Sequence, residues 1–265
     1  MLPAMESSDV LLIEREGAVA RLTLNRPSTR NALNEELIRR LRAAVLEVGE
    51  DPSVRAVILG ASGEGFCSGA DLREGLSASP DRTLDERIDE LHDVVRGIVH
   101  APKPFVAEVN GGAVGFGADL ALACDLRVLS STGYIQEKFV KIGLMPDGGG
   151  TFWMPRLVGI GRALEYLMLG TKIEASLALE LGLANRVVEP SALSETSAEL
   201  AQELAKGPPL ALAQIRKAVR ESFSGTIDDA LKREKSGQIG LLQSADLMEG
   251  VLAWVQRRDP KFSGK

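Results

Sequence analysis

One carboxylate stands where its neighbours could make it a proton-transfer group. Asp147 follows Pro146 and precedes three glycines, at positions 148 to 150. Proline fixes its own φ angle and glycine permits tight turns, so this segment holds the carboxylate in one place. Residues 151–158 are largely apolar, and poor hydration raises the pKa of a carboxyl group towards values useful for proton transfer. The alternative is that Asp147 caps the next helix, because aspartate is a favoured N-cap residue.

Two glycine-rich segments share a second pattern, in which a buried strand leads into glycines and then into a helix. The first covers residues 57–72 and the second covers residues 105–117. Each could present free backbone N–H groups at a helix N-terminus. A dinucleotide-binding fold is the rival interpretation, but residues 115–120 lack the third glycine and the chain has no P-loop sequence.

The elements that must position these segments are first strands alternating with helices and then helices alone. Apolar runs predict strands at residues 10–13, 19–24, 54–59, 104–109, 125–129 and 184–188. Helical spacing predicts helices from Asn34 and at residues 84–99, 113–124, 193–206, 210–222, 227–239 and 244–256. Pro208-Pro209 predicts a boundary between a body of residues 1–207 and a helical region of residues 208–265.

Composition narrows the classes of protein. The 265 residues are 45% hydrophobic with a net charge of −6, which describes a globular protein and argues against nucleic-acid binding. No apolar run approaches the roughly 20 residues of a membrane span, and the start lacks a secretory signal, so we expect a cytoplasmic protein. The two cysteines, Cys67 and Cys124, are too few for a disulfide framework or a cysteine metal site. Structural roles are favoured for the residues that could suggest a nucleophile or metal site, namely Cys67, Ser68, His92 and His100.

Five segments together resemble the enoyl-CoA hydratase/isomerase (crotonase) superfamily. They are Leu24-Asn25-Arg26-Pro27, Asn31-Ala32-Leu33-Asn34, Phe66 to Leu72, Asn110 to Gly117 and Ile142 to Gly150. The resemblance covers about residues 8 to 265 and includes the ending, Glu249 to Phe262. It implies an α/β fold, a crotonase-type spiral of ββα units with a helical C-terminal region used in homotrimers or dimers of trimers. The 142–150 segment resembles the branch of the phenylacetate-pathway ring-epoxide isomerase and the Δ3,Δ2-enoyl-CoA isomerases.

The resemblance also implies a mechanism. The backbone N–H groups of Ala70 and Phe116 would hold the thioester oxygen of an acyl-CoA while an enolate forms. Hydratases of the family hold water between two glutamates, and the matching positions here are Asp119 and Phe139, which disfavours hydration because phenylalanine cannot deprotonate water. Glu137 is assigned no role, since two residues of extended chain separate it from that position.

Isomerases of the family use one acid where Asp147 stands. We therefore expect an enoyl-CoA isomerase that shifts a 3-enoyl to a 2-enoyl thioester. This reaction involves no metal or redox cofactor, and coenzyme A counts as part of the substrate. Asp119 could share the catalysis, raise the pKa of Asp147 or bond to its own helix. The alternatives are a hydratase that uses Asp119 and a non-catalytic scaffold of the same fold that binds RNA or protein.

The substrate-binding residues are carried over from the same resemblance. Coenzyme A is expected to contact Arg26, Ala32, Ala70, Asp71, Leu72, Lys261 and Phe262, the last two on a neighbouring subunit's ligand. Phe139 and Trp153 are expected in the acyl pocket, and the 74–83 loop is expected to shape it.

Overall fold

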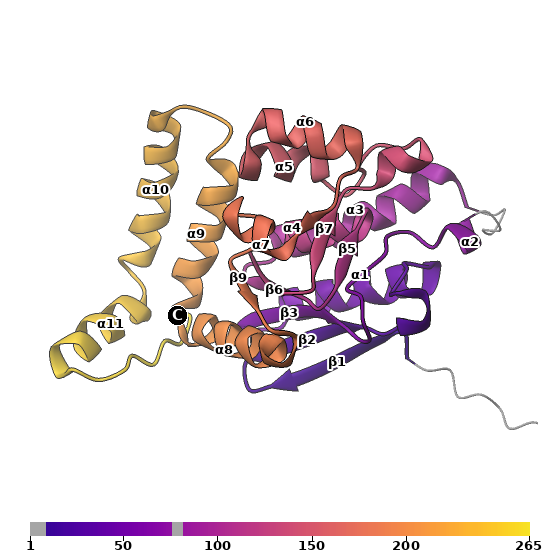
Figure 1. Cartoon of the computed structure of the whole chain (residues 1–265). Coiled ribbons are helices and arrows are strands. Elements are labelled where there is room, and N and C mark those ends of the chain that lie inside the picture. Colours follow the sequence, from indigo (N-terminus) through magenta and orange to yellow (C-terminus); the bar gives the residue numbers. More distant parts are fainter. Residues whose placement is uncertain (1–8, 76–81) are drawn as a thin grey trace, which may run out of the picture.

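A six-stranded sheet forms the centre of the body, in the order β1-β2-β3-β4-β6-β9 (Figure 1). The computed structural model describes residues 9–75 and 82–265. β1 (Leu11–Glu16) pairs antiparallel with β2 (Val19–Leu24). The remaining neighbours are parallel, and they are β3 (Ala56–Ala61), β4 (Phe105–Val109), β6 (Leu126–Ser130) and β9 (Arg186–Val188). All six strands were predicted from apolar runs, within a few residues at their ends.

Helices cover both faces of this sheet, which explains why the central strands are apolar throughout. Val19, Ile58 and Val106 pack with Leu200 of α8 (Leu193–Lys206) on one face. The larger core on the other face involves α1 (Glu35–Glu50), α3 (Leu84–His100) and α4 (Phe116–Ala123). Asn34 caps α1 by accepting a hydrogen bond from the Leu37 N–H, as the sequence predicted for the start of this helix.

A second, three-stranded sheet was not predicted. It contains β5 (Gly112–Val114), β7 (Tyr134–Gln136) and β8 (Ile173–Glu174) in the order β5-β7-β8. Strands of two or three residues are too short to show an alternating pattern, and residues 113 and 114 were assigned to a helix because they continue an apolar run. The chain instead turns at Gly115, whose φ of 56° suits glycine, before α4 begins.

The remaining body elements connect the two sheets. They are α2 (Leu72–Gly75), α5 (Gly150–Val158), α6 (Ile160–Leu169), α7 (Ala175–Glu180) and the short 3₁₀ helices at Pro27–Thr29, Phe139–Ile142 and Pro190–Ala192. In the described residues, no helix combines the length and apolar character needed to cross a bilayer. The expected 74–83 loop lies largely outside the described residues.

Three helices follow α8 and lie to one side of the sheet (Figure 1): α9 (Pro209–Glu221), α10 (Ile227–Leu241) and α11 (Ala245–Gln256). The chain passes from α8 to α9 at Gly207 and Pro208, the position of the predicted domain boundary, which itself stays a prediction. The last residue returns to this region, because the carbonyl oxygen of Lys265 accepts the Ala245 N–H.

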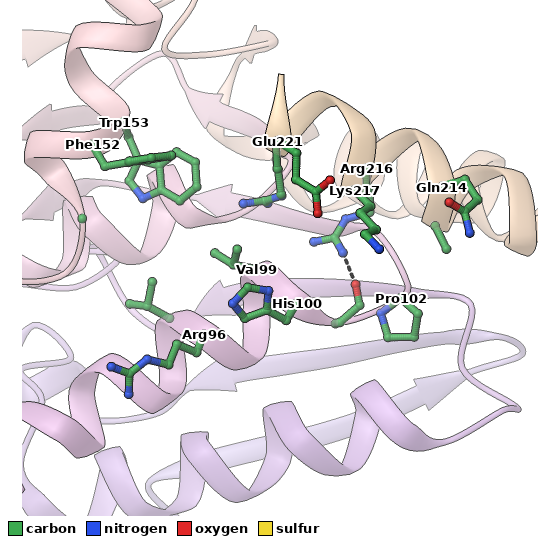
Figure 2. Close-up of a pocket in the computed structure, with 15 residues that line it drawn as sticks. Arg96, Val99, His100, Pro102, Phe152, Trp153, Gln214, Arg216, Lys217 and Glu221 are labelled. Carbon is green, nitrogen blue, oxygen red and sulfur yellow. Dashed lines mark hydrogen bonds between the residues drawn. The ribbon is translucent and has the colours of Figure 1, made fainter. Parts of the chain in front are cut away.

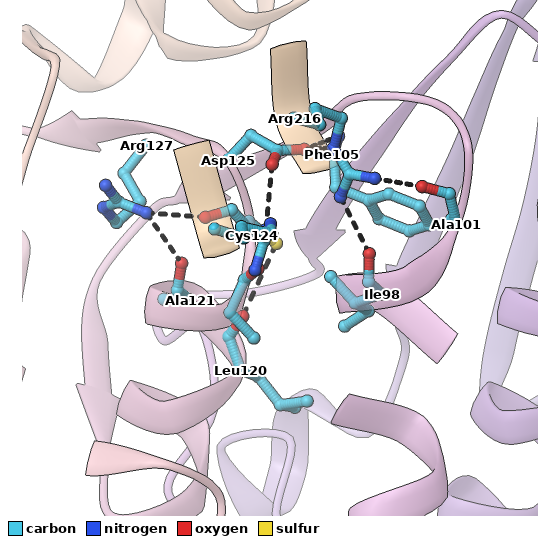
Figure 3. A network of polar contacts seen from close by, with 11 residues as sticks. Ile98, Ala101, Phe105, Leu120, Ala121, Cys124, Asp125, Arg127 and Arg216 are labelled. Atoms are coloured by element: carbon cyan, nitrogen blue, oxygen red, sulfur yellow. Dashed lines mark hydrogen bonds and ion pairs between the residues drawn. The ribbon is translucent and has the colours of Figure 1, made fainter. Parts of the chain in front are cut away.

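Charged contacts attach α9 to the body (Figure 3). Arg216 donates to Asp125 at 2.7 Å and to the Ile98 carbonyl at 2.9 Å, and it also contacts the carbonyl of Ala101. Arg220 donates to the second oxygen of Asp125 at 2.8 Å. Because the Arg216 side chain is only 9% exposed, this is a well-shielded ion pair that fixes α9 to the end of α3 and the start of β6.

Candidate active site

A cavity of about 930 Å³ lies where the two glycine-rich segments meet the segment before α5. Its lining includes Ala70, Leu72, Phe116, Phe139 and Asp147. The sequence therefore identified residues from three separate segments that the fold brings to one place.

Close backbone contact between the glycine-rich segments shapes one side of this cavity. The Cys67 N–H donates to the Gly112 carbonyl at 3.1 Å, and the Val114 N–H donates to the Cys67 carbonyl at 2.8 Å. A side chain at Gly117 would overlap that same carbonyl oxygen, so only glycine permits the approach.

Two backbone donors are left over at this junction. The N–H groups of Ala70 and Phe116 donate to no acceptor within the described part of the chain. A Cβ on Gly69 would lie 3.5 Å from the Phe116 nitrogen, which places the two loops side by side. Phe116 is also the first residue of α4, where the helix dipole favours negative charge. The junction can therefore receive an oxygen that gains negative charge.

Asp147 faces the same cavity but is not a helix cap. The N-cap of α5 is Gly149, so the capping interpretation is wrong. The Oδ1 atom of Asp147 is buried and has no hydrogen-bond partner among the described residues. Burial raises the pKa of this carboxyl group, and the nearby His92 opposes the rise. His92 Nε2 also lies 2.8 Å from the Asp147 backbone carbonyl oxygen and must donate to it, because a carbonyl only accepts.

Two further acids lie behind Asp147. Asp119 is fully buried, and its Oδ2 accepts the Gly148 N–H at 3.0 Å. Glu137 is only 2% exposed. Burial is the main cause that raises the pKa of Asp119 to about 7, and burial together with the charges of Asp119 and Asp147 raises the pKa of Glu137 well above its usual value. Neither acid lines the cavity.

Sequence reasoning missed Glu137, which was expected to lie too far from the site. Glu137 follows β7 directly and lies two residues after Ile135, which is fully buried, so continued alternation turns its side chain to the same side. The apolar residue two positions earlier was the signal that this carboxyl group points inwards.

Comparison with known proteins identifies the family. The sequence model of the protein family described as enoyl-CoA hydratase/isomerase matches residues 14–265 of this chain. This chain belongs to the enoyl-CoA hydratase/isomerase family. It is 35% identical over 260 residues to 1,2-epoxyphenylacetyl-CoA isomerase of Escherichia coli (strain K12), covering 97% of this chain and 99% of that protein. It is also 35% identical over 257 residues to a short-chain-enoyl-CoA hydratase of Clostridium acetobutylicum, covering 96% and 97%.

The fold comparison agrees. An enoyl-CoA hydratase from Bacillus anthracis superposes with a TM-score of 0.92 at 29% identity, over 97% of this chain and 100% of that chain. The crotonase-type fold expected from the sequence is therefore confirmed, and the chain is an acyl-CoA enzyme of the hydratase/isomerase family.

The residues expected to bind coenzyme A are only partly gathered at the cavity. Ala70 and Leu72 line it. The Arg26 guanidinium contacts the carbonyl of Ala32 and donates to Asp71 at 3.0 Å, so it links the end of the first glycine-rich segment to residues 26–32. The contact of these residues with the coenzyme A portion of the substrate stays a prediction.

The two expected C-terminal contacts lie away from the cavity of their own chain. The Lys261 N–H donates to Glu249 at 2.7 Å, and Phe262 lies against Gly250 of α11. The expectation that they reach the ligand of a neighbouring subunit stays a prediction. Two cations that the sequence reasoning did not select, Arg30 and Lys138, do line the cavity.

The two aromatic residues expected in the acyl pocket are separated. Phe139 lines the cavity that holds Asp147, whereas Trp153 lines a second cavity of about 710 Å³ between α3, α5 and α9 (Figure 2). Its ring meets Phe152 edge to face at 4.7 Å. The expectation for Trp153 is corrected for this reason: α5 begins at Gly150, and its first turn points the indole towards α9.

The raised pKa of Asp119 predicts a specific pH dependence of stability. Because the folded-state pKa lies above the unfolded value, the folded state holds its proton more tightly, and this stabilisation is lost as pH rises towards and through about 7. From pH 5 to pH 8 the native chain should therefore lose unfolding free energy on the order of 3 kcal/mol that Asp119→Asn does not lose. Urea unfolding at both pH values measures this difference.

A matched control for this experiment is Glu180→Gln, which neutralises an exposed carboxyl group on α7. It should follow the native pH dependence. If Asp119→Asn also follows it, the carboxyl group of Asp119 does not carry the predicted shift.

Proposed function

We propose that this enzyme is an enoyl-CoA isomerase that moves a double bond from the 3 position to the 2 position of an acyl-CoA thioester. One observation carries the proposal. Among the three neighbouring acids Asp119, Glu137 and Asp147, only Asp147 lines the cavity beside the two available N–H groups.

The chemistry follows from that arrangement. Asp147 in its ionised form removes a proton from C2 of the 3-enoyl thioester, and the electrons move onto the thioester oxygen. The N–H groups of Ala70 and Phe116 donate to that oxygen as its charge grows, and a preorganised donor of this kind contributes about 10²–10³ in rate. Asp147 then returns the proton to C4. The reaction needs only the substrate and these groups.

The geometry supports isomerisation more than water addition. Phe139 occupies the position where hydratases of the family carry a glutamate, and it lines the cavity. Asp119 and Glu137 lie together, as a water-holding pair would, which is the observation that favours a hydratase as the second candidate. Both side chains are shielded from the cavity, so substrate water would have to pass the packed turn at residues 148–150 to reach them.

The substrate has a coenzyme A end and an acyl end, which have different chemistry. We propose that Arg30 and Lys138, which line the cavity, meet the phosphate groups of coenzyme A, because a polyanion needs cationic contacts. The chain is equally identical to a relative named as an isomerase and to one named as a hydratase, so identity does not narrow the acyl group further. We therefore propose it only as a 3-enoyl thioester.

Asp147→Asn tests the proposal directly. The substitution keeps the shape and removes the base, so kcat/KM for the shift from 3-enoyl-CoA to 2-enoyl-CoA should fall by about 10²–10⁴. In the native enzyme the rate should fall as pH drops through the pKa of Asp147. Because that pKa is raised, this decline should lie above the ordinary aspartate value of about 3.9.

Spectrophotometric assays with 3-enoyl-CoA and 2-enoyl-CoA distinguish the candidates. Efficient hydration that survives Asp147→Asn would contradict the isomerase and support the hydratase. Turnover of neither substrate by the native chain would support a non-catalytic scaffold. The circular dichroism spectrum of Asp147→Asn should match that of the native chain, so that a loss of activity can be separated from a loss of fold.

We also propose that the enzyme is a homotrimer or a dimer of trimers. The last two helices expose large apolar side chains, among them Trp254 at 82%, Ile227 at 72% and Met248 at 69%. A second protein surface would remove this apolar area from water. Sedimentation of the full chain should give a mass of three or six chains, which falls when Trp254 and Met248 are both changed to glutamate. A monomeric native chain would contradict the proposal.

A further inference from the structure

The turn that carries Asp147 is packed directly against the two buried acids. A Cβ on Gly148 would lie 2.6 Å from the Asp119 Cβ. A Cβ on Gly150 would lie 2.8 Å from Glu137 Oε1 and 2.9 Å from Asp119 Oδ1. The two carboxyl oxygens therefore converge on one point of the turn, from α4 on one side and from the end of β7 on the other.

These converging oxygens accept no hydrogen bond within the described residues, although the nearby Gly150 N–H lowers the pKa of Asp119 and so favours its charged form. Asp119 Oδ1 and both carboxyl oxygens of Glu137 are buried without a hydrogen-bond partner among the described residues. The charged groups that face them are Asp147 on the turn and, next to Asp147, His92 on α3. Among the described residues, no arginine or lysine contributes to the pKa shift of Asp119 or Glu137.

Two adjacent carboxylates in a poorly hydrated interior cannot both remain ionised without a compensating cation. One proton held between them removes the repulsion and satisfies an oxygen on each side, because a protonated carboxyl group donates one hydrogen bond. Asp119 can then keep accepting the Gly148 N–H with its other oxygen.

We propose that Glu137 is a positioning residue for Asp147, acting through a buried acid pair in which Glu137 and Asp119 share one proton. Protonated Glu137 donates to Asp119 Oδ1, Asp119 holds Gly148, and the turn fixes the adjacent Asp147 against the substrate. This role rests on the proposed isomerase function for its kinetic effect, whereas the shared proton is a property of the protein without substrate.

Three variants separate this role from simple packing. Glu137→Gln keeps the size and a donor, so kcat for the double-bond shift should fall by less than about tenfold. Glu137→Leu has no donor and leaves Asp119 unsatisfied, so kcat should fall by roughly 10- to 100-fold with little change in KM. Adding Asp119→Asn to Glu137→Leu should recover part of that loss, because the unsatisfied acid becomes neutral.

Infrared spectroscopy of the substrate-free protein tests the proton itself. At pH 8, above the pKa of about 7 of Asp119, the native protein should show the C=O band of a buried carboxylic acid, and this band should be missing in Glu137→Gln. The exposed-site variant Glu180→Gln should keep the band.

Several results would overturn the acid pair. They are the absence of such a band, an equal loss of kcat in Glu137→Gln and Glu137→Leu, or full activity in both. If the native chain shows no isomerase activity at all, the proposed function fails, and the infrared band alone then decides whether the pair exists.

Discussion

The direct backbone contact between the two glycine-rich segments is the constraint on which the rest of the site depends. Cys67 exchanges hydrogen bonds with Gly112 and Val114, and Gly117 packs against its carbonyl oxygen. This contact leaves two N–H groups, from Ala70 and Phe116, at one wall of the cavity without acceptors among the described residues. The donors are held by the fold before a substrate arrives, and such preorganisation is what makes them effective for a developing negative charge.

The second constraint is electrostatic. Three acids lie around one glycine turn, but burial separates their roles. Asp147 meets the cavity and is partly hydrated, whereas Asp119 and Glu137 are shielded and have strongly raised pKa values. An acid that ionises more readily can act as the base, while its buried neighbours retain a proton. Environments that push the pKa values of neighbouring groups apart are typical of proton-transfer sites.

The sequence predicted the elements that have a long apolar pattern and failed where the structure depends on short ones. Six strands of the main sheet were predicted because each is an apolar run bounded by turn residues. β5 and β7 are three residues long, and no periodicity can be read from three residues. That omission hid the position of Glu137, because only the pairing of β7 with β5 brings the residue after β7 next to α4. Trp153 was misplaced because the direction of a side chain depends on where its helix starts.

The central claim is that one acid, Asp147, carries a proton across the substrate while the two N–H groups hold the enolate. The most direct measurement is the fate of deuterium placed at C2 of a 3-enoyl-CoA substrate, followed by mass spectrometry and nuclear magnetic resonance of the product. The account predicts a 2-enoyl-CoA product with a measurable fraction of that deuterium at C4. A product with no deuterium at C4, or one that has gained an oxygen atom from solvent, would contradict it.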